Sequence, residues 1–457
     1  MELEEKGEEG IGEAEINEEK REVEEGLKMK GIFIIFGIGS LLAWNAILSD
    51  IRFFIHYQGD YDPSTSFSFF NYALNIVFQF IMIWKKQLLS YKIQLIFGLI
   101  TSIINLIILP IVVISFDKNS KIGFCLTAMI ILFQGLANAF CSVGFYGLAS
   151  FFPMEMIISL STGQGISGIL MNIIEYIILA SVNTGDDDKD NKYGAIIYFS
   201  ISSFILLATL IILLFAFKTD YFKYYLAQTK DFNKFENQEE ININHREINT
   251  LSTGVNENRE TLIEEKNTIE ENNKNNDINF IGLFKLLYDI DLLSCYMYVV
   301  TFSLFPTAVI NQRLFKFKKY RTITIITIYN IFGTLGRSIF YKIEPKKLLA
   351  YITILGRSVL LFTLIFNFYA DQKLNFDKHN LSSIFLIFNA SLLAITNGIG
   401  TSLCFGLAPF LVEDKFKGRA GSSVGFFNIF GIFLGTCFAF GTKSIMKSIG
   451  EYNDDED

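Results

Sequence analysis

The sequence predicts an all-α polytopic membrane protein with about eleven transmembrane helices, six before a central polar block and five after it. Hydrophobic residues make up 51% of the 457 residues, and charged residues only 19%. The charges gather at the N-terminus, in the central block and in short loops, which leaves apolar runs of about twenty residues or more. Runs of this length can span a bilayer as helices.

Hydropathy along the chain places the expected spans in order. Six are expected near 29–52, 67–86, 91–116, 122–149, 154–182 and 193–217. Five more are expected near 287–311, 321–343, 348–370, 381–412 and 419–447. The longest spans exceed the thickness of a bilayer, so they must tilt, bend or project beyond it.

Composition divides the chain into five segments. We expect an acidic, disordered cytoplasmic tail over 1–28, a first helical bundle over 29–217, a cytoplasmic linker over 218–285, a second bundle over 286–447 and an acidic tail over 448–457. The linker is rich in Asn, Glu and Lys and has few aromatic residues, so it cannot bury enough apolar surface to order itself. Two interpretations of it stay open, a plain tether and a regulatory segment.

The distribution of Lys and Arg in short loops predicts a cytoplasmic N-terminus and an extracellular C-terminus. Lys85, Lys86 and Lys92 would then lie in the cytoplasm, as would the basic residues near 342–347 and 415–419. The basic loop over 313–321 disagrees, because this orientation places it outside.

Composition and motifs argue against several functions. The formal net charge of -8 arises largely from the acidic tail and linker, so it indicates solvated segments and no nucleic-acid partner. The five cysteines form no C-x-x-C pair and the three histidines are scattered, so we expect no metal and no cofactor. The chain contains no H-E-x-x-H, G-x-S-x-G or Walker-type motif, which argues against an enzyme. No obligatory protein partner is evident.

Glycines recur within two of the spans at intervals that let helices approach closely. Gly163, Gly165 and Gly168 lie in the fifth span, and Gly421 and Gly425 lie in the last. We expect them to serve helix packing.

Charged residues inside the spans are the strongest functional signal, because an Arg or Asp at a helix centre costs about 2.5–3.5 kcal/mol. Arg337, Arg357 and Glu175 are of this kind. Asn330 and Arg337 are seven residues apart and share one helix face with Gly333 between them. This open, polar face is suited to lining a cavity.

Six stretches together resemble the equilibrative nucleoside transporter family, and they occur in the family's order. They are GIGSLLAWNAILSDIRFF (37–54), GFYGLASFFP (144–153), STGQGISGI (161–169), YNIFGTLGR (329–337), TNGIGTSLCFGLAP (396–409) and EDKFKGRAGSSVGFF (413–427). The resemblance implies a pseudo-symmetric six-plus-five fold similar to the major facilitator architecture. It also implies facilitative, alternating-access transport of nucleosides, and of nucleobases as a further possibility, through a central site. The plasma membrane is the family's usual location.

The family's substrate contacts carry over onto a few positions. Trp44, next to Asn45, corresponds to the tryptophan that packs against the ligand, and Arg337 to the arginine that helps hold the ribose. Asn330 lies on the face of Arg337 and is a weaker candidate. An amphipathic aromatic ring beside a base and a forked donor near sugar hydroxyls both make physical sense.

The chain departs from the family pattern at several of its polar positions. Ser142 stands where the family has the glutamine that reads the base, and Gln134, two turns earlier, is a candidate substitute. Gly333 stands where the family has an aspartate, so Arg337 loses its local partner, which is costly in a membrane. We expect Glu175 to supply that carboxylate or to carry a proton. A proton-coupled carrier of nucleosides, nucleobases or another small solute therefore stays open, as does a nontransporting sensor on the same fold.

Overall fold

The computed structural model describes residues 2–84, 89–181, 187–227, 280–305, 307–310, 312, 320–339, 346–374, 381–413 and 416–450, with side chains from Gly26 onward except at a few helix ends. The first half holds α1 (Glu2–Ser49), α2 (Ile51–Gln58), η1 (Gly59–Tyr61), α3 (Pro63–Trp84), α4 (Tyr91–Ser115), α5 (Lys121–Ala149), α6 (Met154–Ser181), α7 (Asp187–Ala216) and α8 (Asp220–Ala227). The second half holds α11 (Phe280–Leu304), α12 (Thr307–Ile310), α13 (Arg321–Ser338), α14 (Lys347–Gly356), α15 (Val359–Leu374), α16 (Leu381–Leu407), η4 (Ala408–Leu411) and α17 (Lys417–Ile449).

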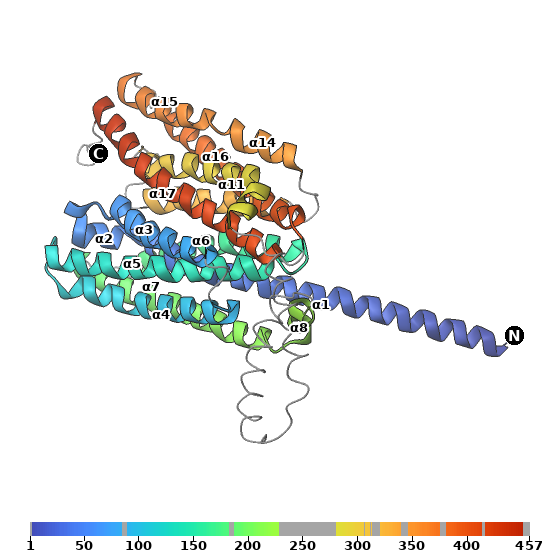
Figure 1. Ribbon diagram of the computed structural model, residues 1–457. Helices are drawn as coiled ribbons and strands as arrows, with labels where there is room; N and C mark the ends of the chain where they lie inside the picture. Colours follow the sequence, from blue (N-terminus) through green and yellow to red (C-terminus); the bar gives the residue numbers. More distant parts are fainter. Residues whose placement is uncertain are drawn as a thin grey trace, which may run out of the picture.

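The helices form two bundles that lie side by side, one from each half of the chain (Figure 1). In the first bundle α1 packs on α6 and α4 on α5, and in the second α11 packs on α17 and α13 on α16. The bundles meet where α13 contacts α6 and where α17 contacts α3 and α5. The predicted all-α membrane fold is confirmed.

Nine helices in the described part of the chain are long and apolar enough to cross a membrane. They are α1 from Gly26 onward, α3, α4, α5, α6, α7, the α14–α15 pair, α16 with η4, and α17. The helices α11 and α13 pack among those of the second bundle without reaching the same apolarity. The count of eleven spans therefore stays a prediction.

Two of the expected spans are broken by a charged residue. Asp50 separates α1 from α2, and Arg357 lies at the junction of α14 and α15. The Arg357 side chain is 2% exposed, and its guanidinium donates to Thr301 Oγ1 (2.8 Å), Asn397 Oδ1 (3.3 Å) and the Leu393 carbonyl (3.2 Å). Arg357 thus bridges three helices inside the second bundle, because a buried guanidinium needs hydrogen-bond acceptors.

Most residues of the predicted tails and linker lie outside the described residues or have only their backbone described. Only the backbone of α1 is described over 2–25, and residues 228–279 and 451–457 lie outside the described residues. At the edges of the predicted linker, 220–227 form α8 and α11 begins at Phe280. The division into tail, linker and bundles stays a prediction.

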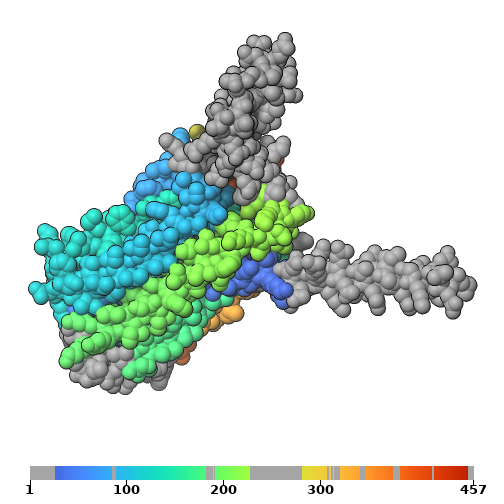
Figure 2. Space-filling view, turned by 90° about the horizontal axis from the view of Figure 1, so that it is seen from below, coloured from blue at the N-terminus to red at the C-terminus, as the bar shows by residue number. Residues whose placement is uncertain are grey.

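The outer faces of the bundles are apolar, as lipid contact requires. On α4 the exposed side chains recur at helical spacing, as in Ile93, Phe97, Ile100, Ile104 and Ile111. Figure 2 shows this side of the first bundle, where α4 and α7 lie next to each other. The polar side chains are consequently directed toward the interior.

Glycine backbones bring the principal helix pairs into contact. A Cβ on Gly163 of α6 would overlap the Ile34 carbonyl of α1, and one on Gly37 would overlap the Leu160 carbonyl in return. In the second bundle a Cβ on Gly431 of α17 would overlap the Cys295 carbonyl of α11. Such backbone-to-backbone contacts leave no room for any side chain.

We predict that Gly163→Ala destabilises the protein by about 1–3 kcal/mol, because the added methyl group overpacks the α1–α6 contact. Thermal unfolding of the purified protein in detergent measures the loss. Gly441→Ala in α17 is the matched control, since a Cβ there meets nothing within 4 Å. An equal effect of both substitutions would contradict the close α1–α6 packing.

Candidate functional site

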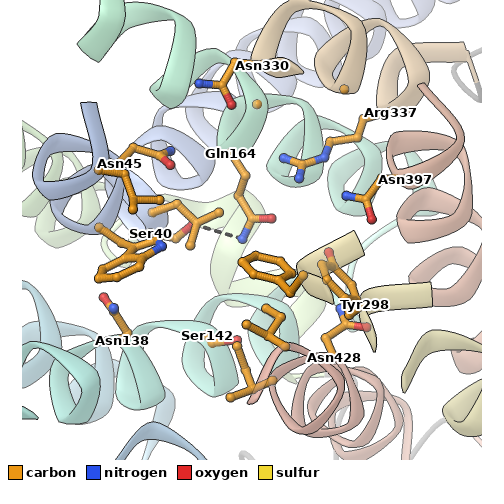
Figure 3. Close-up of a pocket in the computed structure, with 18 of the residues that line it drawn as sticks. Ser40, Asn45, Asn138, Ser142, Gln164, Tyr298, Asn330, Arg337, Asn397 and Asn428 are labelled. Carbon is orange, nitrogen blue, oxygen red and sulfur yellow. Dashed lines mark hydrogen bonds between the residues drawn. The ribbon is translucent and has the colours of Figure 1, made fainter. Parts of the chain in front are cut away.

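A cavity lies between the two bundles, and helices of both halves line it (Figure 3). Its volume of about 140 Å³ is on the scale of a small organic solute. The first bundle contributes Ser40, Leu41, Trp44, Asn45, Leu48, Ser49, Tyr72, Asn75, Asn138, Ser142, Tyr146, Gln164 and Gly165. The second contributes Tyr298, Phe302, Phe305, Ile326, Tyr329, Asn330, Gly333, Thr334, Arg337, Asn397, Phe405, Gly425, Asn428, Ile429 and Ile432.

Arg337 of α13 is the only charged residue among the described residues that line the cavity. Its Nη1 donates to the Ser161 carbonyl of α6 at 3.1 Å, and its Nε has no partner within the described part of the chain. A guanidinium has five N–H donors, so most of them stay available to a bound molecule. Arg337 therefore gives the cavity a positive, forked hydrogen-bond donor.

Aromatic rings form a second part of the lining. Trp44 meets Tyr72 edge to face at 5.4 Å between ring centroids, and Tyr72 contacts Phe302 of the other bundle at 5.8 Å. Tyr146 of α5 stacks on Phe405 of α16 at 3.6 Å. These rings offer flat apolar surfaces with polar edges, which suits a planar heterocycle.

Amide and hydroxyl groups supply the remaining polarity. Tyr146 Oη donates to Gln164 Oε1 (2.6 Å), and Gln164 Nε2 donates to Ser40 Oγ (3.1 Å), which joins α5, α6 and α1. Further amides belong to Asn45, Asn75, Asn138, Asn330, Asn397 and Asn428. Because each amide both donates and accepts, the lining can match a neutral polar molecule on several sides.

Five of the site residues expected from the sequence line this cavity. They are Trp44, Asn45, Ser142, Asn330 and Arg337. Asn45 Nδ2 also donates to Ser167 Oγ at 2.5 Å, so it joins α1 to α6. The structure thus brings together residues that lie almost 300 positions apart in the chain.

Gln134 does not line the cavity. It is 0% exposed inside the first bundle, where its Oε1 accepts from Asn105 (3.2 Å) and its Nε2 donates to Ser102 (3.0 Å) and Asn138 (3.0 Å). Asn138 is the residue of this group that reaches the cavity. Gln134 therefore positions Asn138. It does not take over the role of the family glutamine, whose position is occupied by Ser142.

The expected pairing of Glu175 with Arg337 is wrong in this structure. Arg337 reaches α6 at Ser161, which lies fourteen residues before Glu175 and so about 21 Å away along the helix. Glu175 is instead hydrogen-bonded to the Asp50 side chain, and it interacts electrostatically with Arg52. Arg337 makes up for the missing aspartate with a backbone carbonyl, because that carbonyl is the acceptor within its reach.

Several lining residues were not expected from the sequence, among them Ser40, Tyr146, Gln164 and Asn397. A signal was present for Gln164 and Asn397, because both are polar residues within the quoted stretches 161–169 and 396–409. Tyr146 also lies in a quoted stretch, 144–153, but a tyrosine in an apolar span is equally typical of packing.

The glycines that were expected to serve helix packing face three different helices. Gly163 faces α1, as described above, and the others face α13 or α5. Gly165 and Gly168 face α13, where a Cβ would overlap Thr334 and Asn330 respectively. Gly421 faces α5, where a Cβ would overlap the Ser150 hydroxyl. Gly425 has ordinary spacing, 3.7 Å from Ser142 Oγ, and lines the cavity. The α6 and α17 glycines thus set how closely the two bundles approach each other.

Contacts between the bundles lie at both ends of the cavity. At the end of the α1–α2 junction, Lys443 Nζ of α17 pairs with Asp62 Oδ2 (2.5 Å) just before α3, and Tyr176 of α6 bonds to Thr324 of α13 (2.7 Å). At the other end, Ser422 of α17 donates to the Val143 carbonyl of α5 (3.4 Å). The cavity is therefore held between two sets of interbundle contacts.

No group of three or more His, Cys, Asp or Glu side chains is placed to hold a metal ion anywhere in the described ranges. The polar groups of the cavity are amides, hydroxyls and one guanidinium, which lack the paired acid and base of hydrolytic sites. The arrangement is suited to binding a polar solute.

The chain matches the family model described as "Nucleoside transporter" over residues 127–444, more than half of its length. It is 26% identical to "Equilibrative nucleotide transporter 7" of Arabidopsis thaliana over 412 residues, covering 88% of this chain and 91% of that protein. It is 20% identical to "Equilibrative nucleoside transporter 1" of Homo sapiens over 460 residues, covering 91% and 96%.

Among solved structures, the chain is similar to a proton:xylose symporter of the major facilitator superfamily bound to 6-bromo-6-deoxy-D-glucose. The TM-score is 0.59 at 13% identity, and the match covers 92% of this chain and 95% of the symporter. At this identity the likeness shows the fold alone, which is that of the major facilitator superfamily. Family model and relatives together show that the chain belongs to the nucleoside transporter family.

Proposed function

We propose that the protein carries nucleosides across a membrane by alternating access, with the cavity between its bundles as the substrate site. The observation that carries this proposal is a solute-sized cavity lined by both bundles and flanked at both ends by contacts between them. Family and fold are those of transporters and not of enzymes. Rocking of one bundle against the other would open the cavity to each side in turn.

The lining gives each part of a nucleoside a chemical counterpart. The rings of Trp44 and Tyr72 offer apolar faces to a base, and the guanidinium of Arg337 offers donors to sugar hydroxyls. The amides of Asn138 and Gln164 also line the cavity and supply donors and acceptors for the edge of the base (Figure 3). Nucleobases, which lack the sugar, would use the aromatic and amide part alone.

We propose that the protein lies in the plasma membrane and that its N-terminus faces the cytoplasm. Lys30 at the start of the α1 span pairs with Glu155 at the start of α6 (2.5 Å), and Lys347 at the start of α14 pairs with Asp289 of α11 (2.8 Å). The alternation of the helices places these lysines at one end of the bundles, away from the α1–α2 junction. An excess of Lys and Arg at one end favours the cytoplasmic side.

Counterflow of labelled uridine and adenosine in proteoliposomes tests the function and the site. We predict that Arg337→Ala lowers exchange about 10- to 100-fold, because hydrogen bonds to a charged group contribute about 1.5–3 kcal/mol. Trp44→Ala lowers exchange as well, through loss of the ring surface. Arg337→Lys keeps the charge without the fork and rescues only part of the rate.

Ile331→Ala is the matched control, because Ile331 lies on the exposed side of α13. It should exchange like the wild type. Wild-type rates in both Arg337→Ala and Trp44→Ala would overturn the site, and no saturable exchange by the wild-type protein would overturn the function.

We predict that Asp62→Asn favours opening of the cavity at the α1–α2 end, because it removes the ion pair with Lys443. The pair is partly exposed, so its contribution is below about 1 kcal/mol and the change in population is at most about fivefold. Distances between spin labels at positions 60 and 444, measured by electron paramagnetic resonance, report the opening. A larger open population shifts them toward longer separations. Asp117→Asn, an exposed acid at the same end, should leave the distances unchanged.

The same ion pair predicts the effect of pH. Burial alone would raise the pKa of Asp62, but hydrogen bonds from Lys443 and Ser64 outweigh it and hold this pKa below the ordinary value. A lowered pKa means that the contact is complete above the usual range of carboxyl groups and is lost as pH falls through the lowered pKa. The label distances should therefore lengthen on acidification in the wild type but not in Asp62→Asn.

A further inference from the structure

Two buried carboxyl groups lie against each other at the end of α1, outside the cavity. Asp50, between α1 and α2, is 6% exposed, and Glu175 of α6 is 4% exposed. Their side chains are hydrogen-bonded to each other. A carboxylate is only an acceptor, so this bond requires a proton on one of the two groups. Two negative charges in such contact within a buried site would repel strongly.

The surroundings compensate only in part for a negative charge on this buried pair. From α2, the exposed side chain of Arg52 supplies one positive charge to both carboxyl groups, and from α7 the fully buried Tyr198 hydroxyl lies close to both. From α6 itself, Asn172 is 0% exposed, and its Nδ2 has no partner among the described residues. Asn172 is one turn before Glu175, so an unused amide donor is available when a carboxylate forms.

Ser49 connects this pair to the cavity through its place in the chain and one hydrogen bond. Ser49 lines the cavity and directly precedes Asp50 in the chain. Its hydroxyl donates to Asn172 Oδ1 at 2.6 Å, which ties α1 to α6 one turn from Glu175. A change in the distance between Asp50 and Glu175 is therefore transmitted to a residue of the cavity wall.

We propose that Asp50 and Glu175 form a proton-binding site that couples the transport of the solute to the movement of protons. The proposal rests on the transport function proposed above. A proton from water binds one carboxylate oxygen, and the resulting O–H donates to the other carboxylate, which holds the α1–α2 junction against α6. When the proton leaves, the two carboxylates repel and this end of the α1–α6 contact loosens. No other bond is made or broken.

Infrared spectroscopy of the whole protein tests the shared proton without reference to transport. At pH 7 exposed carboxyl groups are ionised, so the carbonyl stretching band of a protonated acid that shifts in D₂O reports a buried one. We expect this band to weaken in both Asp50→Asn and Glu175→Gln and to persist in Glu155→Gln, an exposed acid on the same helix. A band unaffected by both substitutions would overturn the shared proton.

Proteoliposomes with an imposed pH difference test the coupling, with labelled uridine and adenosine as probes. For one proton per solute, a difference of one pH unit sustains about tenfold accumulation on the alkaline side. We expect the wild type and Glu155→Gln to accumulate the probe, and Glu175→Gln and Asp50→Asn to equilibrate it without accumulation while still exchanging it in counterflow.

The outcomes separate the two proposals. Wild-type counterflow without any response to the pH difference would overturn the coupling and leave the carrier function intact. Accumulation driven by a sodium gradient alone would also overturn it, because the site would then serve a metal cation. Absence of wild-type counterflow would instead contradict the carrier function itself. Because the infrared band is measured separately, a variant that folds but does not transport still reports on the proton.

Discussion

The structure depends on one constraint: a helix bundle that faces lipid must turn its polar groups inward and find partners for them there. The outer row on α4, from Ile93 to Ile111, shows the apolar side of this requirement. On the inner side, Gln134 is bound by three neighbours and Arg357 by three acceptors. Two of the polar atoms that remain without a partner among the described residues belong to functional places, Arg337 Nε at the cavity and Asn172 Nδ2 beside the carboxyl pair.

Helix α6 connects the two bundles because its glycines face two directions. Gly163 admits the backbone of α1, and Gly165 and Gly168 admit Thr334 and Asn330 of α13. The same helix carries Gln164 at the cavity and Glu175 near its far end. A shift of α6 relative to α1 therefore changes the cavity wall, the interbundle contact and the carboxyl pair together, which is the kind of linkage that alternating access requires.

Much of this could be predicted from the sequence, because apolar length and ordered motifs are local signals. They placed most helices within a few residues, although α11 begins seven residues earlier than expected, and they predicted Trp44 and Arg337 as residues of one central site. The partners of polar residues could not be predicted in the same way. Glu175 and Ser161 share a helix, and only the register of α13 against α6 decides that Arg337 reaches Ser161. The break at Asp50 was likewise hidden, since an acid at the end of an apolar run is equally typical of a loop.

The separation of Glu175 from Arg337 has its own consequence for the charge of the protein's interior. Had Arg337 paired with Glu175, the arginine would have kept that carboxylate ionised, because an adjacent positive charge favours the charged form. With about 21 Å of helix between Ser161 and Glu175, the carboxyl pairs with Asp50 and a proton takes the place of the cation. The cavity in turn keeps Arg337 without an acidic residue among its described lining, so its potential is positive. A positive, amide-rich cavity favours neutral or anionic solutes over organic cations, which agrees with nucleosides as cargo.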